Sequence, residues 1–531
     1  MVATQEARAT QIGLEVLKKG GNAVDAAVAV GFALAVTLPR AGNIGGGGFM
    51  LIHMAKTGKT VALDYREKAP EAATHDMYIN PLGRVVKMLS RSSYQSVGVP
   101  GSVAGLAAAL EKYGTLPLSD LIAPAIQLAE EGMVVNDDHV ATLTKGRTRL
   151  QFWPETAKIF YKPDGSVFER GEILVQKDLA GSLRQIAEQG PRVFYEGAIS
   201  EKIVADMEAN GGLITRKDLK DYDVVFREPV RGSYRGYEIV AMPPPSSGGI
   251  HVIQLLNTLE PYPIQNLGHN SADTIHLMAE AMKLAFADRS KHLGDSDYWQ
   301  VPIMGLTSKA YATQLRNSID PNRARPASEI GPGNPIPYES NETTHFSIID
   351  KEGNTVSNTT TINFSFGTGI VAKGTGILLN NEMENFTAKV GVPNAYGLLG
   401  GYANVIHLRK RPLSSMSPML VLKKGKPFLA TGSPGGPRII PTMLQIIMNV
   451  IDHRMNIAEA TNARRFHHQW KPDELRIEKG FNQDTLRLLK KKGHHLIEKN
   501  AIGSTQSVMR TDDGLFGASD PRRMGALTLG Y

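Results

Sequence analysis

Two adjacent threonines, Thr343 and Thr344, follow Glu342 at the start of a predicted strand, and a hydroxyl placed there could act as a nucleophile. Residues 346–350 alternate between faces, the next four residues have turn composition, and residues 355–361 run back. This pattern predicts a β-hairpin. Threonine also favours strands through its shape alone, so the pattern leaves a structural and a chemical interpretation of Thr343 open.

Two further motifs carry groups that catalysis could use. In GSPGG, Gly435 and Gly436 leave backbone N–H groups unshielded by side chains, which suits an oxyanion hole, although a tight turn needs the same residues. Arg66 follows a predicted strand in LDYREKAP and is either a clamp for a carboxylate or a surface ion pair. Taken singly, neither motif decides between its two interpretations.

Several other kinds of site are disfavoured. The run GNIGGGGF lacks the Lys-Ser/Thr of a phosphate loop, so close backbone packing explains it better. The chain has no cysteine, which excludes disulfides, thiolate zinc sites and a cysteine nucleophile. The pairs His467-His468 and His494-His495 lack the i, i+4 spacing of a helical zinc site, and there is no GxSxG elbow. We therefore expect no metal site.

Composition narrows the choice of partners. The formal net charge of +7 mildly favours anionic small molecules, but no basic stripe with interleaved aromatic residues suggests nucleic acid. A hydrophobic content of 42% is enough for a sizeable core. The longest apolar run, residues 26–36, is too short to cross a bilayer and lacks the flanks of a signal peptide.

Hydrophobic periodicity predicts the elements that must hold these groups. The helices are expected at residues 7–19, from a cap at Asn22 to just before Pro39, repeatedly between 100 and 230, and at 250–259, 272–287, 441–450 and 457–463. Strands are expected at 49–53 and 60–65, and the chain becomes strand-rich after residue 343. Residues 319–342 lose apolar periodicity and gain Pro, Gly and Asn, which predicts a flexible linker upstream of Thr343.

The motifs GNAVDAAVAVGFALAVTLPRAGNIGGGGFMLI, LDYREKAP, MPPPSSGGIH, TTHFSIIDKEGN, LLNNEMENF, RPLSSMSP and TGSPGGPRII stand in order along the chain. Together they resemble the γ-glutamyltransferase family (γ-glutamyltranspeptidase, glutathione hydrolase) of N-terminal-nucleophile hydrolases, over essentially the whole chain. The family's export signal and opening segment are not matched, so we expect a leader to be missing here. The resemblance implies an α+β fold, a four-layer αββα sandwich, with no cofactor.

The resemblance also implies self-cleavage. The bond between Glu342 and Thr343 would break, giving a large fragment, 1–342, and a small fragment, 343–531, that remain together as a heterodimer. The flexible linker, about 319–342, would supply the freedom for this step. The freed α-amine of Thr343, with a reference pKa near 8, would act as general base for its own hydroxyl. Thr344 would stay structural.

Roles for other residues follow from the resemblance. Thr361 would orient the Thr343 hydroxyl, and Gly435 and Gly436 would donate to the oxyanion. The substrate-binding residues implied are Arg66, Ser414 and Ser415 for the α-carboxylate of a γ-glutamyl group, Asn363, Glu382 and Asn385 for its α-ammonium, and Tyr396 in a lid.

One position departs from the family pattern. Asn385, in LLNNEMENF, stands where members acting on γ-glutamyl groups usually carry an aspartate that contacts the α-ammonium. A charge-assisted hydrogen bond is worth about 1.5–3 kcal/mol, against about 1 kcal/mol for a neutral one. We therefore expect weaker selection for the amine and more tolerance of glutaryl groups.

The expected activity is the opening of γ-glutamyl amides, such as glutathione, through an ester on Thr343, with transfer to water, an amino acid or a short peptide. A related glutaryl or cephalosporin acylase stays open as an alternative. So does a binding homologue that keeps the pocket and never cleaves itself. We expect no nucleic-acid partner and no membrane span, and the family's export implies a periplasmic or extracellular location.

Overall fold

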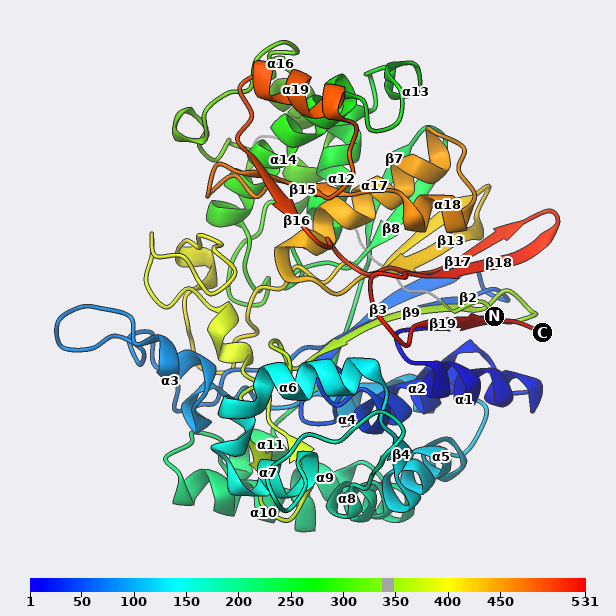
Figure 1. Ribbon diagram of the computed structural model, residues 1–531, viewed down its shortest axis with the longest axis vertical. Helices are drawn as coiled ribbons and strands as arrows, with labels where there is room; N and C mark the ends of the chain where they lie inside the picture. Colours follow the sequence, from blue (N-terminus) through cyan, green and yellow to red (C-terminus); the bar gives the residue numbers. More distant parts are fainter. Residues whose placement is uncertain (337–347) are drawn as a thin grey trace.

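Two antiparallel sheets lie face to face at the centre of the computed structural model, which describes residues 1–336 and 348–531 (Figure 1). One sheet has six strands in the order β18-β17-β13-β12-β8-β7, and the other has four in the order β6-β3-β2-β9. The predicted cleavage residues Glu342 and Thr343, and Thr344 beside them, lie outside the described residues.

Both sheets combine strands from before and after position 343. The six-stranded sheet consists of β7 (Val230–Tyr234), β8 (Tyr237–Ala241), β12 (Met419–Lys423), β13 (Lys426–Gly432), β17 (Gln506–Thr511) and β18 (Gly514–Ser519). The four-stranded sheet consists of β2 (Gly47–Met54), β3 (Lys59–Tyr65), β6 (Val225–Arg227) and β9 (Thr355–Thr361). Strand β12 pairs with β8, and β9 pairs with β2, so hydrogen bonds join the two parts of the chain in each sheet.

Helices cover the outer face of each sheet (Figure 1). Over the six-stranded sheet lie α12 (Gly248–Leu259), α14 (Ala272–His292), α17 (Ile439–Ile451) and α18 (Ile457–Asn462); beyond the four-stranded sheet lie α1 (Ala7–Lys18), α2 (Ala23–Thr37), α4 (Ser102–Tyr113) and α5 (Leu118–Glu131). These layers confirm the predicted αββα sandwich.

The remaining elements complete the body. The remaining helices are α3 (Lys87–Arg91), α6 (Asp137–Gln151), α7 (Pro154–Phe160), α8 (Lys177–Gln189), α9 (Arg192–Glu196), α10 (Ala198–Ala209), α11 (Arg216–Lys220), α13 (Ile264–Leu267), α15 (Ile303–Thr307), α16 (Lys309–Asn317) and α19 (Gln483–Lys491). The minor strands are β1 (Val2–Thr4), β4 (Met133–Val134), β5 (Ile173–Leu174), β10 (Val371–Ala372), β11 (Ile377–Leu378), β14 (Phe466–His467), β15 (Leu475–Glu478), β16 (Leu496–Lys499) and β19 (Leu527–Leu529). Among the described helices, none combines the length and apolar character that crossing a bilayer requires.

Local sequence explains the start of the fold. Asn22 accepts hydrogen bonds from two backbone amides of α2, and Asp25 returns the contact, so the predicted cap is a full capping box. Helix α2 is buried almost all round because it packs against α1, α5 and β9, which accounts for its alanine-rich sequence. Close packing of the glycine run is confirmed: a Cβ on Gly46 would lie 2.0 Å from the carbonyl oxygen of Thr361.

The predicted hairpin is confirmed over its described part. Ile349 forms a β-bridge with Thr355, and the Val356 amide donates to the Ile348 carbonyl at 2.6 Å. The turn between them is closed by the Asp350 amide, which donates to the Asn354 carbonyl at 2.9 Å.

The segment predicted to be a flexible linker is not loosely attached where it is described. It has little regular structure, but the backbone of residues 320–335, here called the strap, is held by side chains that are mostly buried. Its carbonyl groups accept from His276, Lys283, His292, Trp470 and Lys492, and its amides donate to Glu280, Asp288, Asp473 and the carbonyl of Lys492. The sequence correctly predicted that this segment lacks regular structure. It gave no indication of the side chains that bind its backbone.

The strap joins the parts of the chain before and after position 343. Helix α14 holds it from one side, while Trp470, Asp473 and Lys492 hold it from the other. Trp470 donates from Nε1 to the carbonyls of Ala327 and Ile330 at 3.0 and 3.1 Å, and both of these strap residues are buried in the main core.

Substituting Trp470→Phe keeps most of the ring but removes both hydrogen bonds to the strap. Because each neutral bond is worth about 1 kcal/mol, losing both costs about 2 kcal/mol, so we expect the strap amides to exchange with deuterium roughly thirtyfold faster. Hydrogen-exchange mass spectrometry on peptides covering 320–335 measures this. The matched control is Trp299→Phe, at a tryptophan that is 39% exposed. Exchange at the rate of an unstructured chain in the unmodified protein would contradict the clamped strap.

Candidate active site

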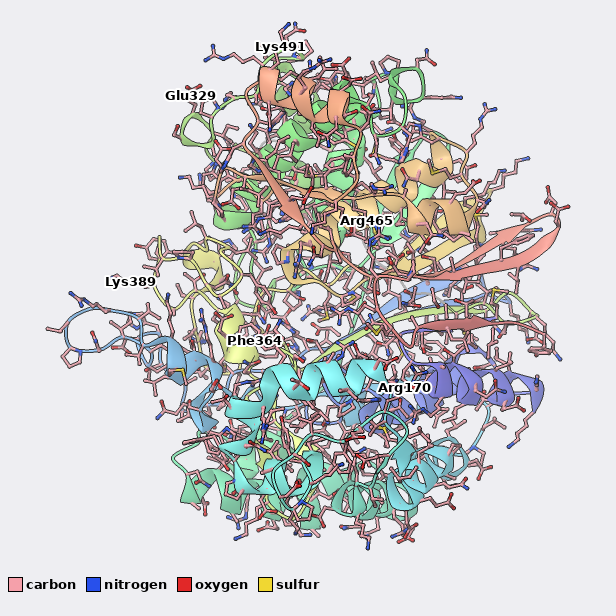
Figure 2. The ribbon with its side chains drawn as sticks, viewed as in Figure 1. Arg170, Glu329, Phe364, Lys389, Arg465 and Lys491 are labelled. Carbon is pink, nitrogen blue, oxygen red and sulfur yellow. The ribbon has the colours of Figure 1, made fainter. Side chains whose placement is uncertain are left out.

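A cavity of about 700 Å³ lies where the end of β9 meets the loops that follow β3 and β13. Its lining contains every predicted site residue that the structure describes: Arg66, Thr361, Asn363, Glu382, Asn385, Tyr396, Ser414, Ser415, Gly435 and Gly436. Phe364, which also lines it, lies near the centre of the molecule between the upper and lower helical layers (Figure 2). These residues are far apart in sequence, so the fold alone brings them together.

Backbone geometry explains the glycines of this cavity. Gly435 and Gly436 follow β13 with φ of 141° and 59°, a region that favours glycine. A Cβ on Gly436 would also lie 3.0 Å from ring carbons of Tyr396. The loop is therefore a tight turn whose backbone faces the same cavity as Thr361.

A buried ion pair lies in one wall of the cavity. Arg66 Nη2 is 2.8 Å from Glu382 Oε2, and Arg66 Nη1 donates to Glu67 Oε2 at 3.3 Å. All three side chains are at most 1% exposed, so the interpretation of Arg66 as a surface ion pair is wrong. Burial and the neighbouring Glu382 raise the pKa of Glu67 well above its usual range.

The polar residues beside this pair are already engaged. Asn385 Nδ2 donates to Glu382 Oε2 at 2.5 Å. Asn363 Oδ1 accepts from the Tyr396 hydroxyl at 2.9 Å, and its Nδ2 donates to the Asn381 carbonyl. Tyr396 and Asn363, which both line the cavity, are therefore joined by a hydrogen bond. Asn385 contacts the carboxylate of Glu382 with its donor group, whereas an aspartate there would bring a second negative charge.

The cavity is strongly basic. Its described lining contains one carboxylate, that of Glu382, and seven basic residues: Arg40, Arg66, Lys145, Arg149, Arg289, Arg438 and Arg523. Such an excess attracts anionic ligands. Sequence reasoning had inferred a mild preference for anions from net charge, but it identified only Arg66 among these residues.

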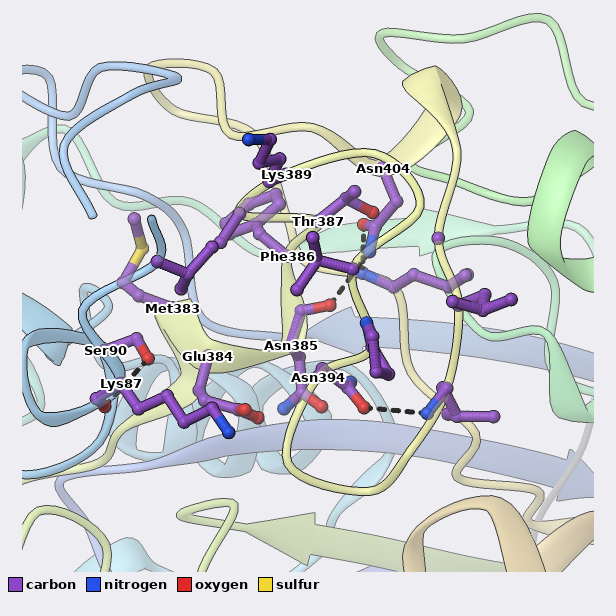
Figure 3. Close-up of a pocket in the computed structure, with 18 of the residues that line it drawn as sticks. Lys87, Ser90, Met383, Glu384, Asn385, Phe386, Thr387, Lys389, Asn394 and Asn404 are labelled. Carbon is purple, nitrogen blue, oxygen red and sulfur yellow. Dashed lines mark hydrogen bonds between the residues drawn. The ribbon is translucent and has the colours of Figure 1, made fainter. Parts of the chain in front are cut away.

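A second, smaller cavity of about 50 Å³ adjoins the first and shares Asn385, Leu398 and Arg289 with it (Figure 3). Glu384, one of the labelled residues around it, accepts a hydrogen bond from the Ala395 amide at 2.7 Å. Burial raises the pKa of Glu384 to about 7. Sequence reasoning had no signal for this residue, because it is one of two glutamates in a short polar stretch.

One group of metal-ligand side chains occurs among the described residues. Ligand atoms of His276, Glu280 and His494 lie within 4.8 Å of one another. His276 Nδ1 and His494 Nε2 are hydrogen-bonded at 2.8 Å, and the ammonium of Lys283 is 2.6 Å from Glu280. These groups already satisfy one another and hold the strap, so we assign no metal here, and the expected absence of a metal stays a prediction.

Comparison with known proteins agrees with this arrangement. The family model described as gamma-glutamyltranspeptidase matches residues 9–529. A glutathione hydrolase proenzyme from Escherichia coli (strain K12) is 56% identical over 533 residues, covering 100% of this chain and 92% of the relative. An acylase ACY 1 proenzyme from Pseudomonas sp. (strain SE83) is 40% identical over 97% of this chain and 90% of the relative.

A solved structure gives the same result. The cephalosporin acylase from Bacillus halodurans superimposes with a TM-score of 0.86 at 29% identity, covering 100% of this chain and 95% of that structure. The sandwich is thus of the N-terminal-nucleophile hydrolase type. Sequence, fold and converging residues lead to one conclusion: this chain is a member of the γ-glutamyltranspeptidase family.

Proposed function

We propose that the protein is a self-processing γ-glutamyltransferase and glutathione hydrolase. The observation that carries this proposal is the convergence of ten predicted residues on one basic cavity. The names of the relatives support the activity, and no cofactor is needed for it.

The proposed reaction begins with the Thr343 hydroxyl. It attacks the γ-carbonyl carbon of the substrate while the α-amine of Thr343 accepts its proton. Gly435 and Gly436 donate backbone N–H to the oxyanion; each such donor is typically worth about 3 kcal/mol. The leaving amine takes the proton and departs. Water or an acceptor amine then attacks the ester on Thr343 and releases the γ-glutamyl group.

The described part of the hairpin supports the place given to Thr343. Ile349 lies opposite Thr355, and in an antiparallel pair each step up one strand matches a step down the other. The same register, if continued, would bring position 343 opposite Thr361. Thr361 would then orient the nucleophile, and its own Oγ1 is held by the Asn363 amide at 2.7 Å.

The ion pair between Arg66 and Glu382 suits an α-amino acid head. Its carboxylate would take Arg66, together with the hydroxyls of Ser414 and Ser415, while its ammonium would take Glu382 and Asn363. The incoming zwitterion has no net charge, so both buried partners would exchange one ion pair for another. This exchange avoids the large penalty of an unpaired buried charge.

The two fragments, 1–342 and 343–531, are proposed to stay together as a heterodimer. Shared sheets and the strap support this, because both would survive the cut. We also propose a periplasmic or extracellular location, on the strength of the family resemblance.

Asn385 favours a second candidate, an acylase for glutaryl or cephalosporin side chains. A glutaryl group has the carboxylate but lacks the ammonium. With Asn385 in place of an aspartate, the site lacks one negative charge that would favour ligands carrying the ammonium. The acylase relatives support this candidate. Glu382 still supplies a carboxylate, so recognition of γ-glutamyl groups is retained in our proposal.

Tyr396 is proposed to act as a lid, and Glu384 is its anchor. Glu384 accepts from Ala395, next to Tyr396, and Arg91 Nη2 is 3.6 Å from its carboxylate. Since the side chain of Glu384 is 3% exposed, ionising its carboxyl group costs desolvation free energy.

Replacing the nucleophile by Thr343→Ala tests the main proposal. We expect one full-length band on a denaturing gel and no turnover of a γ-glutamyl anilide, where the unmodified protein gives two bands and is active. The control Thr344→Ala should cleave and turn over normally. An uncut protein that turns over substrate overturns the mechanism, and an unmodified protein that stays uncut and inactive supports the binding homologue.

Restoring the acid by Asn385→Asp tests specificity. We expect the ratio of kcat/KM for γ-glutamyl over glutaryl anilide to rise about tenfold, because the ammonium regains a charge-assisted bond. Parallel assays with one leaving group measure this ratio. If both proteins discriminate equally, Asn385 has no part in selecting the amine.

Substituting Glu384→Gln tests the lid anchor through pH. A carboxyl whose folded pKa is raised stabilises the fold below its unfolded pKa, near 4.5, and this stability is lost as pH rises to about 7. The glutamine variant lacks this loss. Relative to the protein with Glu384, its free energy of unfolding should therefore rise by roughly 3 kcal/mol between pH 4.5 and 7.5. Urea unfolding in the uncut Thr343→Ala background measures it, with exposed Glu498→Gln as control. Parallel pH profiles for all three proteins would refute the assignment.

A further inference from the structure

Arg289 is a buried cation that the proposed mechanism leaves unused. It lies in the last turn of α14 and is 6% exposed. Its Nε donates to Ser247 Oγ at 2.9 Å, and its Nη2 donates to Ser415 Oγ at 3.1 Å. Both partners are neutral hydroxyls.

The charge of Arg289 is not balanced by a neighbouring acid. Among the described residues, no carboxylate oxygen lies within 4.0 Å of its guanidinium, and burial lowers its pKa to about 10. The negative end of the α14 dipole offsets only part of a unit charge. A buried, charged and unpaired guanidinium is costly, so an anionic ligand that reached it would relieve that cost.

Arg289 is within reach of such a ligand. It lines both the large cavity and the smaller one of Figure 3. Its Nη1 makes no hydrogen bond to a described residue. This nitrogen is also not one of the fully buried side-chain atoms that lack a hydrogen-bond partner. One donor therefore remains available at the wall that the two cavities share.

The contact with Ser415 adds a second effect. Because Ser415 Oγ accepts from Arg289, its own hydrogen is free to donate elsewhere. Ser415 lines the same cavity and is proposed to contact the α-carboxylate. Arg289 thus sets the direction in which that hydroxyl donates.

We propose that Arg289 is a second cationic ligand for the α-carboxylate of the acyl donor, binding it through Nη1 and through the hydroxyl of Ser415. This inference rests on the proposed function and extends it, because it assigns the recognition of the carboxylate to two guanidiniums, Arg66 and Arg289. It selects acyl donors that carry a carboxylate, with or without the neighbouring amine.

A pair of donors tests this role. The γ-glutamyl anilide carries the α-carboxylate, and the 4-aminobutyryl anilide has the same amine and leaving group without it. In Arg289→Gln we expect the ratio of kcat/KM for the first donor over the second to fall about tenfold to a hundredfold, mostly through KM. Arg289→Lys, which keeps the charge but not the fork, should fall less.

The control Lys291→Gln removes the same charge from an exposed position two residues away and should leave the ratio unchanged. If Arg289→Gln lowers kcat/KM for both donors equally, Arg289 is structural and the inference is overturned. Thermal shift with glutarate gives a readout without turnover, and its stabilisation should weaken in Arg289→Gln. An unmodified protein inactive on the γ-glutamyl donor would instead overturn the proposed function.

Discussion

The compensation of one buried charge, the guanidinium of Arg66, constrains the rest of the site. A cation in the interior destabilises a fold strongly unless it is paired. Here its partners are Glu67, the next residue, and Glu382, which comes from the other side of position 343. The same ion pair therefore joins two distant parts of the chain and forms part of the cavity wall.

The described contacts that hold the two parts of the chain together lie away from position 343. Strand β9 pairs with β2, β12 pairs with β8, and the strap is held from both sides. None of these contacts depends on an unbroken backbone at position 343. The proposed cut at position 343 would therefore leave the layers intact.

Local patterns were sufficient for much of this structure. The cap at Asn22, the strand at 355–361 and the close packing of the glycine run each depend on neighbours in sequence or on backbone geometry, which sequence patterns report directly. The resemblance supplied the ten site residues, and their meeting around one cavity was its strongest structural consequence.

The strap and Arg289 show what such patterns miss. Loss of periodicity in 320–335 correctly indicated irregular backbone, but a segment without helix or strand can still be fixed by side chains from elsewhere. Those side chains come from α14 and from residues 470–492, and no local signal connects them to the strap. Arg289 stands in the last turn of a helix, where a cation is ordinary, so only its unpaired burial marks it.

Charge therefore separates the two ends of the proposed ligand. In our proposal the carboxylate end faces Arg66, Arg289 and two serine hydroxyls, so that the loss of one contact would leave three others. The ammonium end would face Glu382, the one carboxylate of the described lining, whose Oε2 also contacts Arg66 and Asn385. An aspartate at 385 would double the negative charge there, whereas Asn385 donates a hydrogen bond to Glu382. If the proposed roles hold, we expect discrimination in this cavity to be firm for the carboxylate and permissive for the amine, which would give a physical reason for an acylase-like breadth in a member of this family.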